Sequence, residues 1–270
     1  MLCRVLHVNR STYYNFINKK PSKREIENQR LRKHLLEIYM KAKKRIGTRA
    51  FKIILLRDYG INISEGRILR LLKAMTLPKM STIKPRFKSN HSPIFSSDNL
   101  LKQEFNPKSP NQVWTTDFTY ISIGPKRHVY LCAILDLHSR YIVAYRLGTE
   151  ITASLVADTV RDAFAREKGK VADGLALHSD QGCQYTSEEY FALTQEYHFA
   201  ASMSRRGCPY DNAIMENFFG TFKTECLYRC RPTTGEQVRQ LVDEYIHFYN
   251  YERIDLKNGL TPYEIRSKAA

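Results

Sequence analysis

Residues 113–123 read VWTTDFTYISI, in which apolar and polar side chains alternate around Asp117. This alternation predicts a β-strand with one buried face. Outward from it, LHSDQGCQY at residues 177–185 places Asp180 after a short strand, and DNAIMENFFGTFK at residues 211–223 places Glu216 on a helix. Sixty-two residues separate the first acid from the second, and 35 separate the second from the third. Carboxylates on such elements can converge to hold two divalent ions that catalyse phosphoryl displacement.

A sheet flanked by helices is predicted from residue 113 onward. After a break at Gly124, residues 128–139 and 140–148 are expected to add the second and third strands of an antiparallel meander. Two shorter strands are expected at residues 175–179 and 200–204. Helices are expected at about residues 152–168, 187–198 and 212–228. This order predicts an α/β fold with a mixed five-stranded sheet. Asp180 would follow a strand end, where ligands of open α/β sheets collect.

A small helical domain is predicted before the sheet, at residues 25–77. Apolar side chains recur at three- and four-residue spacing from Leu31 to Ala42, and a second helix is expected from Thr48 to Tyr59. Gly60 would allow a turn, and Ser64 would cap a third helix. The pattern is typical of a helix-turn-helix, with a generic three-helix bundle as the alternative. Its candidate DNA contacts are Arg49, Lys52, Arg67 and Arg70.

Charge is concentrated in the first part of the chain. Residues 1–110 carry 25 Lys and Arg against 7 Asp and Glu, whereas residues 111–270 carry 18 against 20. A basic segment joined to a near-neutral one favours nucleic-acid binding over solvated helix faces or a membrane surface. No apolar run approaches the roughly 20 residues of a membrane span, and no signal peptide is recognisable, so we expect a cytoplasmic protein. The six cysteines form no zinc-binding pattern and are interpreted as reduced thiols.

Five segments are predicted from these patterns. Residues 78–112 hold five of the ten prolines and little periodicity, which predicts an extended basic linker. The segments are residues 1–24 (an N-terminal segment), 25–77 (helix-turn-helix-like), 78–112 (linker), 113–229 (catalytic core) and 230–270 (a C-terminal helical extension).

Five stretches together resemble one known family. WTTDFTYI (114–121), HSDQGCQYTS (178–187), SMSRRGCPYDNAIMENFFGTFKTE (202–225) and YIHFYNYERIDLKNGLTPYEI (245–265) are similar to the DDE transposases of the IS3 family of bacterial insertion sequences, in their OrfB-type product. Residues 45–75 also resemble that family's helix-turn-helix region. The resemblance covers nearly the whole chain, and it implies that residues 1–24 are an N-terminal remnant of the join to an upstream product. It implies a ribonuclease-H-like integrase core, two Mg²⁺ or Mn²⁺ ions, and cleavage and strand transfer of DNA at element ends.

The resemblance also assigns roles to individual residues. Asp117 would bridge both metal ions, while Asp180 and Glu216 would each hold one. Lys223 lies seven residues after Glu216, on the same helix face, where the family has a basic residue that could contact phosphate. A solvated lysine is the alternative. Arg253 is a further candidate phosphate contact, although Asp255 stands where the family commonly has histidine.

Three other polar residues near the acids are interpreted as structural. His178 could ligate a metal, but a supporting or packing role is favoured. Asp211 and Asn212 are expected to cap the helix that carries Glu216. Asp136 is expected to serve a turn after the second strand.

Two rival functions and several partners follow from the same observations. A ribonuclease-H-like nuclease would cleave without joining, and a non-catalytic DNA-binding regulator would bind without cleaving. The expected partners are DNA at element ends and targets, further copies of the chain on DNA, and an upstream OrfA-type product supplied separately or as a fusion. We expect no membrane partner and a bacterial cytoplasmic, nucleoid-associated location.

Overall fold

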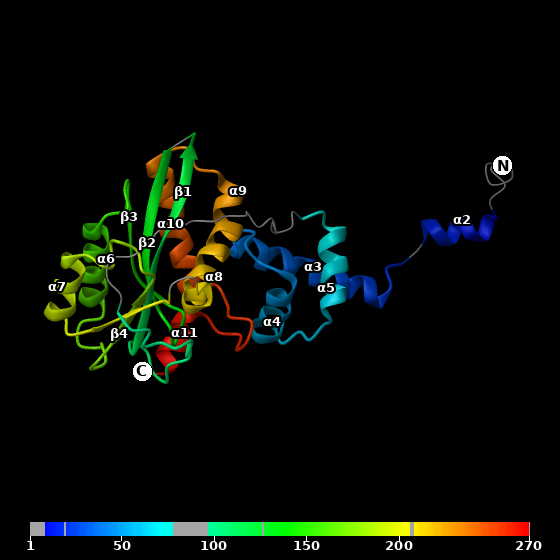
Figure 1. The fold of residues 1–270 in the computed structure, drawn as a ribbon. Coiled ribbons are helices and arrows are strands. Elements are labelled where there is room, and N and C mark those ends of the chain that lie inside the picture. The colour runs from blue at the N-terminus through cyan, green and yellow to red at the C-terminus, as the bar shows by residue number, and fades with distance from the viewer. Residues whose placement is uncertain (1–8, 19, 78–96, 126, 206–207, 270) are drawn as a thin grey trace. The chain divides into compact units, whose positions relative to one another are not determined.

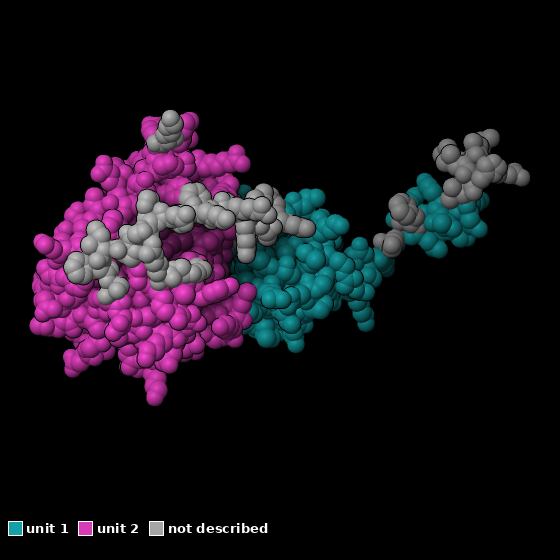
Figure 2. Space-filling model, viewed as in Figure 1, with its two compact units in different colours: residues 1–78 teal, residues 79–270 magenta. Residues whose placement is uncertain are grey.

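Two units make up the chain, residues 1–78 and residues 79–270 (Figure 2). The computed structural model describes residues 9–18, 20–77, 97–125, 127–205 and 208–269. The predicted linker therefore lies largely outside the described residues. Residues 97–112, by contrast, pack on the sheet unit: the backbone N–H of Leu100 donates to Ser202, and Asn99 donates to Asp211. The bounds of the five segments drawn from the sequence stay predictions.

Three helices of the first unit, α3, α4 and α5, share one apolar core. Leu35, Leu55 and Ile68 are fully buried in it, one from each helix. Ser64 accepts a hydrogen bond from the backbone N–H of Arg67 and caps the last helix, as predicted. Gly60 ends the preceding helix with φ of 66°, a left-handed conformation that favours glycine. The helices of this unit are α2 (Arg10–Ile17), α3 (Lys23–Lys41), α4 (Thr48–Tyr59) and α5 (Glu65–Ala74).

The second unit is built on a mixed five-stranded sheet, as predicted. The strands lie in the order β3-β2-β1-β4-β5, in which β1, β2 and β3 are antiparallel while β4 and β5 run parallel to β1. β4 pairs with β1 only from Val113 to Thr115, so the rest of β1 borders β2 alone within the described sheet. The strands are β1 (Val113–Gly124), β2 (Arg127–Asp136), β3 (Ile142–Gly148), β4 (Ala176–Ser179) and β5 (Ala200–Met203).

Helices cover both faces of this sheet (Figure 1). α6 and α7 lie on one face, where Trp114, Val156 and Tyr190 belong to the main core. α8 and α10 lie on the other face; the side chain of Asn250 on α10 donates to and accepts from the backbone of Ile142 on β3. The remaining elements are α6 (Ala153–Arg166), α7 (Glu188–Glu196), η1 (Pro209–Asn212), α8 (Ala213–Phe222), η2 (Lys223–Leu227), α9 (Tyr228–Cys230), α10 (Gly235–Tyr251) and α11 (Pro262–Lys268).

The helix that carries Glu216 differs from the regular helix expected at residues 212–228. It consists of α8, a π-helical segment η2 and the short α9, and a 3₁₀ turn, η1, leads into it. Asn212 occupies the N-cap position, but neither it nor Asp211 makes a capping bond. Asn212 instead accepts from the hydroxyl of Thr115 and donates to the carbonyl of Thr116. The predicted capping is wrong because this side chain ties the helix start to β1.

Asp136 serves the turn after β2, as predicted. It is fully buried and accepts hydrogen bonds from the backbone N–H groups of Asn111 and Ser139. Arg266 on α11 lies 3.5 Å from its carboxylate. The five cysteines in the described part of the chain are free thiols, in agreement with the interpretation of the sequence, and Cys3 lies outside it. Among the described residues, no helix is long and apolar enough to span a membrane.

Candidate active site

Asp117 lies in the middle of β1, opposite Ala133 on β2. Its Oδ1 accepts a hydrogen bond of 2.7 Å from the backbone N–H of Phe118. The pKa of Asp117 is raised to about 8, chiefly by burial and also by the charges of Asp180 and Glu216, against the lowering effects of the Phe118 bond and of Lys223. A carboxyl group in this setting is costly to ionise without a neighbouring cation.

Asp180 directly follows β4, at the carboxyl end of that strand. Its Oδ1 accepts a 2.9 Å hydrogen bond from the backbone N–H of Gly182. A Cβ atom at Gly182 would lie 3.0 Å from the same Oδ1, so glycine leaves the carboxylate the room it needs. Burial raises the pKa of Asp180, and the Gly182 bond lowers it.

Glu216 lies in the first turn of α8 and is the most exposed of the three acids. Partial burial of its carboxyl group raises its pKa. The bonds of Asn212 to Thr115 and Thr116 fix the start of this helix beside β1, two residues from Asp117. The sequence indicated that Asp211 and Asn212 lie at the start of this helix, but it did not predict the contacts of Asn212 with β1.

The structure brings the three carboxylates within electrostatic reach of one another, since two of them shift the pKa of the third. None of the three forms an ion pair with another described residue. As they stand, no three His, Cys, Asp or Glu side chains in the described part of the chain are grouped closely enough to hold a metal ion. The cluster is therefore a set of like charges whose mutual repulsion a cation would relieve.

Lys223 lies two helical turns after Glu216, at the start of η2. Its Nζ is 5.0 Å from the centre of the Tyr120 ring. Burial lowers the pKa of Lys223 and the charge of Asp117 raises it, so this ammonium group lies within reach of the acid cluster. Its contact with DNA stays a prediction.

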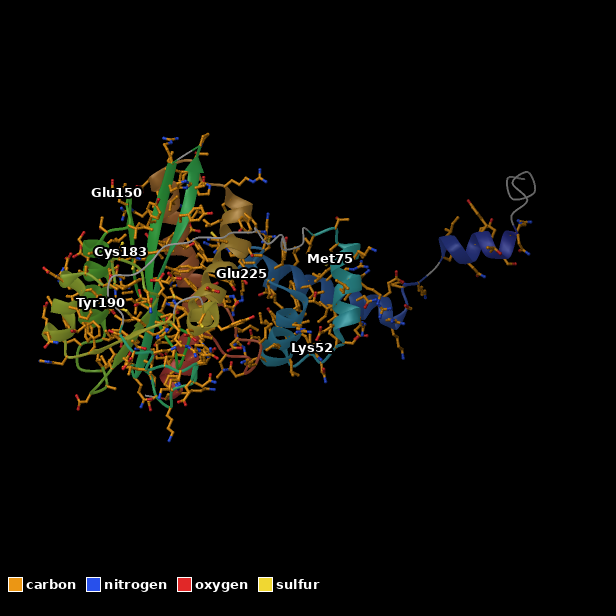
Figure 3. All side chains as sticks on the ribbon, viewed as in Figure 1. Lys52, Met75, Glu150, Cys183, Tyr190 and Glu225 are labelled. Carbon is orange, nitrogen blue, oxygen red and sulfur yellow. The ribbon has the colours of Figure 1, made fainter. Side chains whose placement is uncertain are left out.

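The other residues predicted to contact DNA lie outside the helix that carries Glu216 and Lys223. Arg253 donates to both oxygens of the buried Glu225, a residue of η2 (Figure 3). Its guanidinium therefore has an internal partner, and a phosphate contact there stays a prediction. In the first unit, Arg67 donates to Glu27 and Asn28. The remaining candidates are Arg49 and Lys52 on α4 and Arg70 on α5. Arg49 lies 3.9 Å from Glu65, and Arg70 donates to the carbonyl of Gly66.

His178 has a supporting position on β4, two residues before Asp180. Its Nδ1 is 2.8 Å from the hydroxyl of Ser202 and its Nε2 is 3.0 Å from that of Ser204. Both ring nitrogens are thus engaged within the fold. Burial lowers the pKa of His178 to about 4, although Asp211 raises it. Sequence reasoning could not identify the two serines because Ser202 lies on the neighbouring strand β5 and Ser204 directly follows it.

We expect His178 to make the protein sensitive to acid. Because its pKa is lower in the folded chain, the unfolded chain binds more protons between about pH 6.5 and pH 4. Its contribution to stability is full above pH 6.5 and is lost as the pH falls through about 4, by up to about 3 kcal/mol. Urea unfolding of wild type and His178→Asn across this range should show a smaller pH slope for the variant. Equal slopes would contradict the assignment.

Comparisons with known proteins agree with this geometry. Residues 107–209 match the family described as Integrase core domain, and residues 216–269 match a second family of the same description. The chain is 34% identical over 272 residues to the insertion element IS600 uncharacterized 31 kDa protein of Shigella sonnei, covering 99% of this chain and 98% of that protein. It is 31% identical over 277 residues to the transposase InsF for insertion sequence IS3A of Escherichia coli K12, covering 99% and 93%.

A likeness to a solved structure supports the fold. The simian T-cell lymphotropic virus intasome in complex with PP2A regulatory subunit B56 gamma matches with a TM-score of 0.52 and 14% identity, covering 85% of this chain and 73% of that one. The mixed sheet with helices on both faces is thus the ribonuclease-H-like fold of integrase cores. Together, the family match and the relatives of similar length show that the chain belongs to the IS3-family insertion-sequence transposases and is a DDE-type polynucleotidyl transferase.

Proposed function

We propose that Asp117, Asp180 and Glu216 are the catalytic acids with which this transposase cleaves DNA at the ends of an insertion sequence and joins them to a target. The observation that carries the assignment is that three carboxylates without an ion-pair partner lie within electrostatic reach of one another: burial raises the pKa of Asp117, and so do the other two carboxylates. A fold tolerates such repulsion where a cation or a substrate later offsets it.

The donor set suits hard divalent cations, Mg²⁺ or Mn²⁺, because all three side chains offer carboxylate oxygens. Asp117 would contact two ions from the middle of β1, and Asp180 and Glu216 would each contact one. When bound, two such ions activate the attacking oxygen and stabilise the leaving oxygen of an in-line displacement. Hydrolysis would release a 3′-hydroxyl, whose oxygen then attacks a target phosphodiester and displaces the target's 3′ oxygen.

Cationic residues would bind and position the DNA. Lys223 would contact a phosphate beside the acids, and Arg49, Lys52, Arg67 and Arg70 would contact the duplex through the first unit. Joining two element ends requires two active sites, which favours a homo-oligomer on DNA. An OrfA-type partner and a location on the bacterial nucleoid complete the proposal.

A plasmid assay tests the catalytic assignment. We expect wild type to nick supercoiled DNA with Mg²⁺ or Mn²⁺ and not with EDTA, and Glu216→Gln to lower the rate by at least about 100-fold. Glu188→Gln is a matched control, because Glu188 is also an exposed acid in the first turn of a helix. Nicking by Glu216→Gln at the wild-type rate would contradict the proposal.

The same assay separates the rival functions. A labelled duplex with a 3′-hydroxyl, taken from the DNA that borders the coding sequence, is added to the reaction. Transfer of the label to the plasmid identifies a transposase, whereas nicking without transfer identifies a nuclease. If wild type and Glu216→Gln bind the plasmid with equal salt dependence and neither nicks it, the chain acts as a DNA-binding regulator or requires its OrfA-type partner.

A further inference from the structure

A groove lies beside the acid cluster, between the end of β1 and the end of the helix that carries Glu216. Its volume is about 650 Å³, within the range of roughly 300–1,000 Å³ typical of pockets for small organic groups. One wall is β1 from Tyr120 to Gly124, the part of that strand that borders β2 alone in the described sheet. The other wall comes from η2, α9 and the residues after them.

Two tyrosines and two cations give this groove its chemistry. Tyr120 is 39% exposed, and Tyr228 lies close to it: burial raises the pKa of Tyr228, and so does the neighbouring Tyr120. Lys223 lies over the Tyr120 ring, and Arg231 lines the far end of the groove. Arg231 ends the helix in a left-handed conformation with φ of 43°, which turns the chain to close this wall. None of the described residues that line the groove is acidic.

This combination selects a particular class of ligand. Aromatic faces bind planar rings by stacking, and cations in a groove whose described lining residues include no acid can bind an anion. A nucleotide offers both groups, but a base in a duplex is stacked on its neighbours and cannot reach such a wall. The groove would therefore accept a base that has left the stack, at a cost that is smallest at a duplex end.

Lys223 connects the groove to the acids. The same ammonium group lies over Tyr120 and within reach of the charge of Asp117. A strand whose phosphate lay beside the acids would thus have its next nucleotide at the mouth of the groove. Resting on the proposed function, we propose that Tyr120, Tyr228 and Arg231 form a subsite for one unpaired nucleotide adjacent to the reacting phosphate.

Binding of defined DNA probes in EDTA tests this subsite without any chemistry. The probes are a fully paired closed dumbbell, a hairpin with a 3′ tail, a hairpin with a 5′ tail, and a dumbbell with one internal unpaired nucleotide, each unpaired base being 2-aminopurine. We expect one unpaired probe to bind about 5- to 100-fold more tightly than the paired dumbbell, with quenched fluorescence. Preference for a tail identifies the cleaved element end as the source, and preference for the internal nucleotide identifies target DNA.

Variants locate the effect. Tyr228→Leu should remove the preference and the quenching, Tyr228→Phe should retain both, and Tyr120→Leu should weaken both. Arg231→Ala should lower the preference, while Arg239→Ala, at an exposed arginine of α10, should leave it unchanged. Thermal melting checks that each variant is folded. Equal binding of all probes, or a preference that survives Tyr228→Leu and Tyr120→Leu, would overturn the subsite; because no cleavage is measured, that result leaves the assignment of Glu216 untouched.

Discussion

Asp117→Asn is expected to abolish DNA cleavage and, at the same time, to raise the melting temperature of the metal-free protein. The substitution removes a negative charge that burial and two neighbouring carboxylates make costly. The amide oxygen can still accept the 2.7 Å bond from the backbone N–H of Phe118, so the local geometry is retained. Loss of activity with a gain of stability is the expected signature of a charge kept for function.

The gain of stability should depend on pH in a defined direction. Because the pKa of Asp117 is raised to about 8 in the folded chain from an ordinary value of 3.8, the folded state binds more protons between these values. The contribution of Asp117 to the stability of wild type is fully present below pH 3.8 and is lost as the pH rises through about 8. We expect the free energy of unfolding of Asp117→Asn to exceed that of wild type by at least about 2 kcal/mol near pH 8, which corresponds to about 4–8 °C in melting temperature. Near pH 5 the difference should be much smaller.

Asp136→Asn is the matched control for this experiment. Asp136 is a second buried aspartate of the same strand pair, but it accepts two backbone hydrogen bonds and faces Arg266. Its neutralisation should lower the melting temperature, because an engaged carboxylate is removed. Calorimetry in EDTA measures both variants. If Asp117→Asn melts at or below the wild-type temperature near pH 8, the like-charge description of the site is wrong.

Arg253→Ala is expected to destabilise the second unit by about 3–5 kcal/mol. The side chain of Glu225 is only 5% exposed, and its carboxylate is held by Arg253 and by the hydroxyl of Tyr245 at 2.9 Å. Removing the arginine leaves a buried charge with one neutral partner. Since Glu225 lies on η2 together with Lys223, the loss should also lower cleavage activity.

A double substitution separates charge from packing in this cluster. Replacing both members, Glu225→Gln with Arg253→Met, removes the buried charge and keeps the volume, so most of the stability should return. Arg239→Ala, at an exposed position of α10, should change the free energy of unfolding by less than about 0.5 kcal/mol. Urea unfolding supplies the comparison. A loss below about 1 kcal/mol for Arg253→Ala would show that its guanidinium is free to contact DNA instead.

Local patterns in the sequence predicted the strands of the sheet well, and they predicted the helix ends at Gly60 and Ser64 in the first unit. Alternation over residues 113–123 corresponds to β1, and the periodic run from Thr48 to Tyr59 corresponds to α4. These features depend on neighbours a few residues apart, which is why periodicity reveals them. The π-helical segment was missed because its extra residue is accommodated by packing against α10, through Glu225 and Tyr245, and not by local propensity.

The sequence alone was enough to predict the strand that carries Asp117, the helix that carries Glu216, the basic first part of the chain and the family, while the catalytic role of the three acids stays a prediction. It could not determine which polar groups meet across the fold. Asn212 was expected to cap a helix and instead anchors it to β1, and Arg253 was expected to contact phosphate and is engaged by Glu225. Only the tertiary structure decides such pairings, because hydrogen-bond and charge partners far apart in the chain are selected by burial, which leaves no periodic trace.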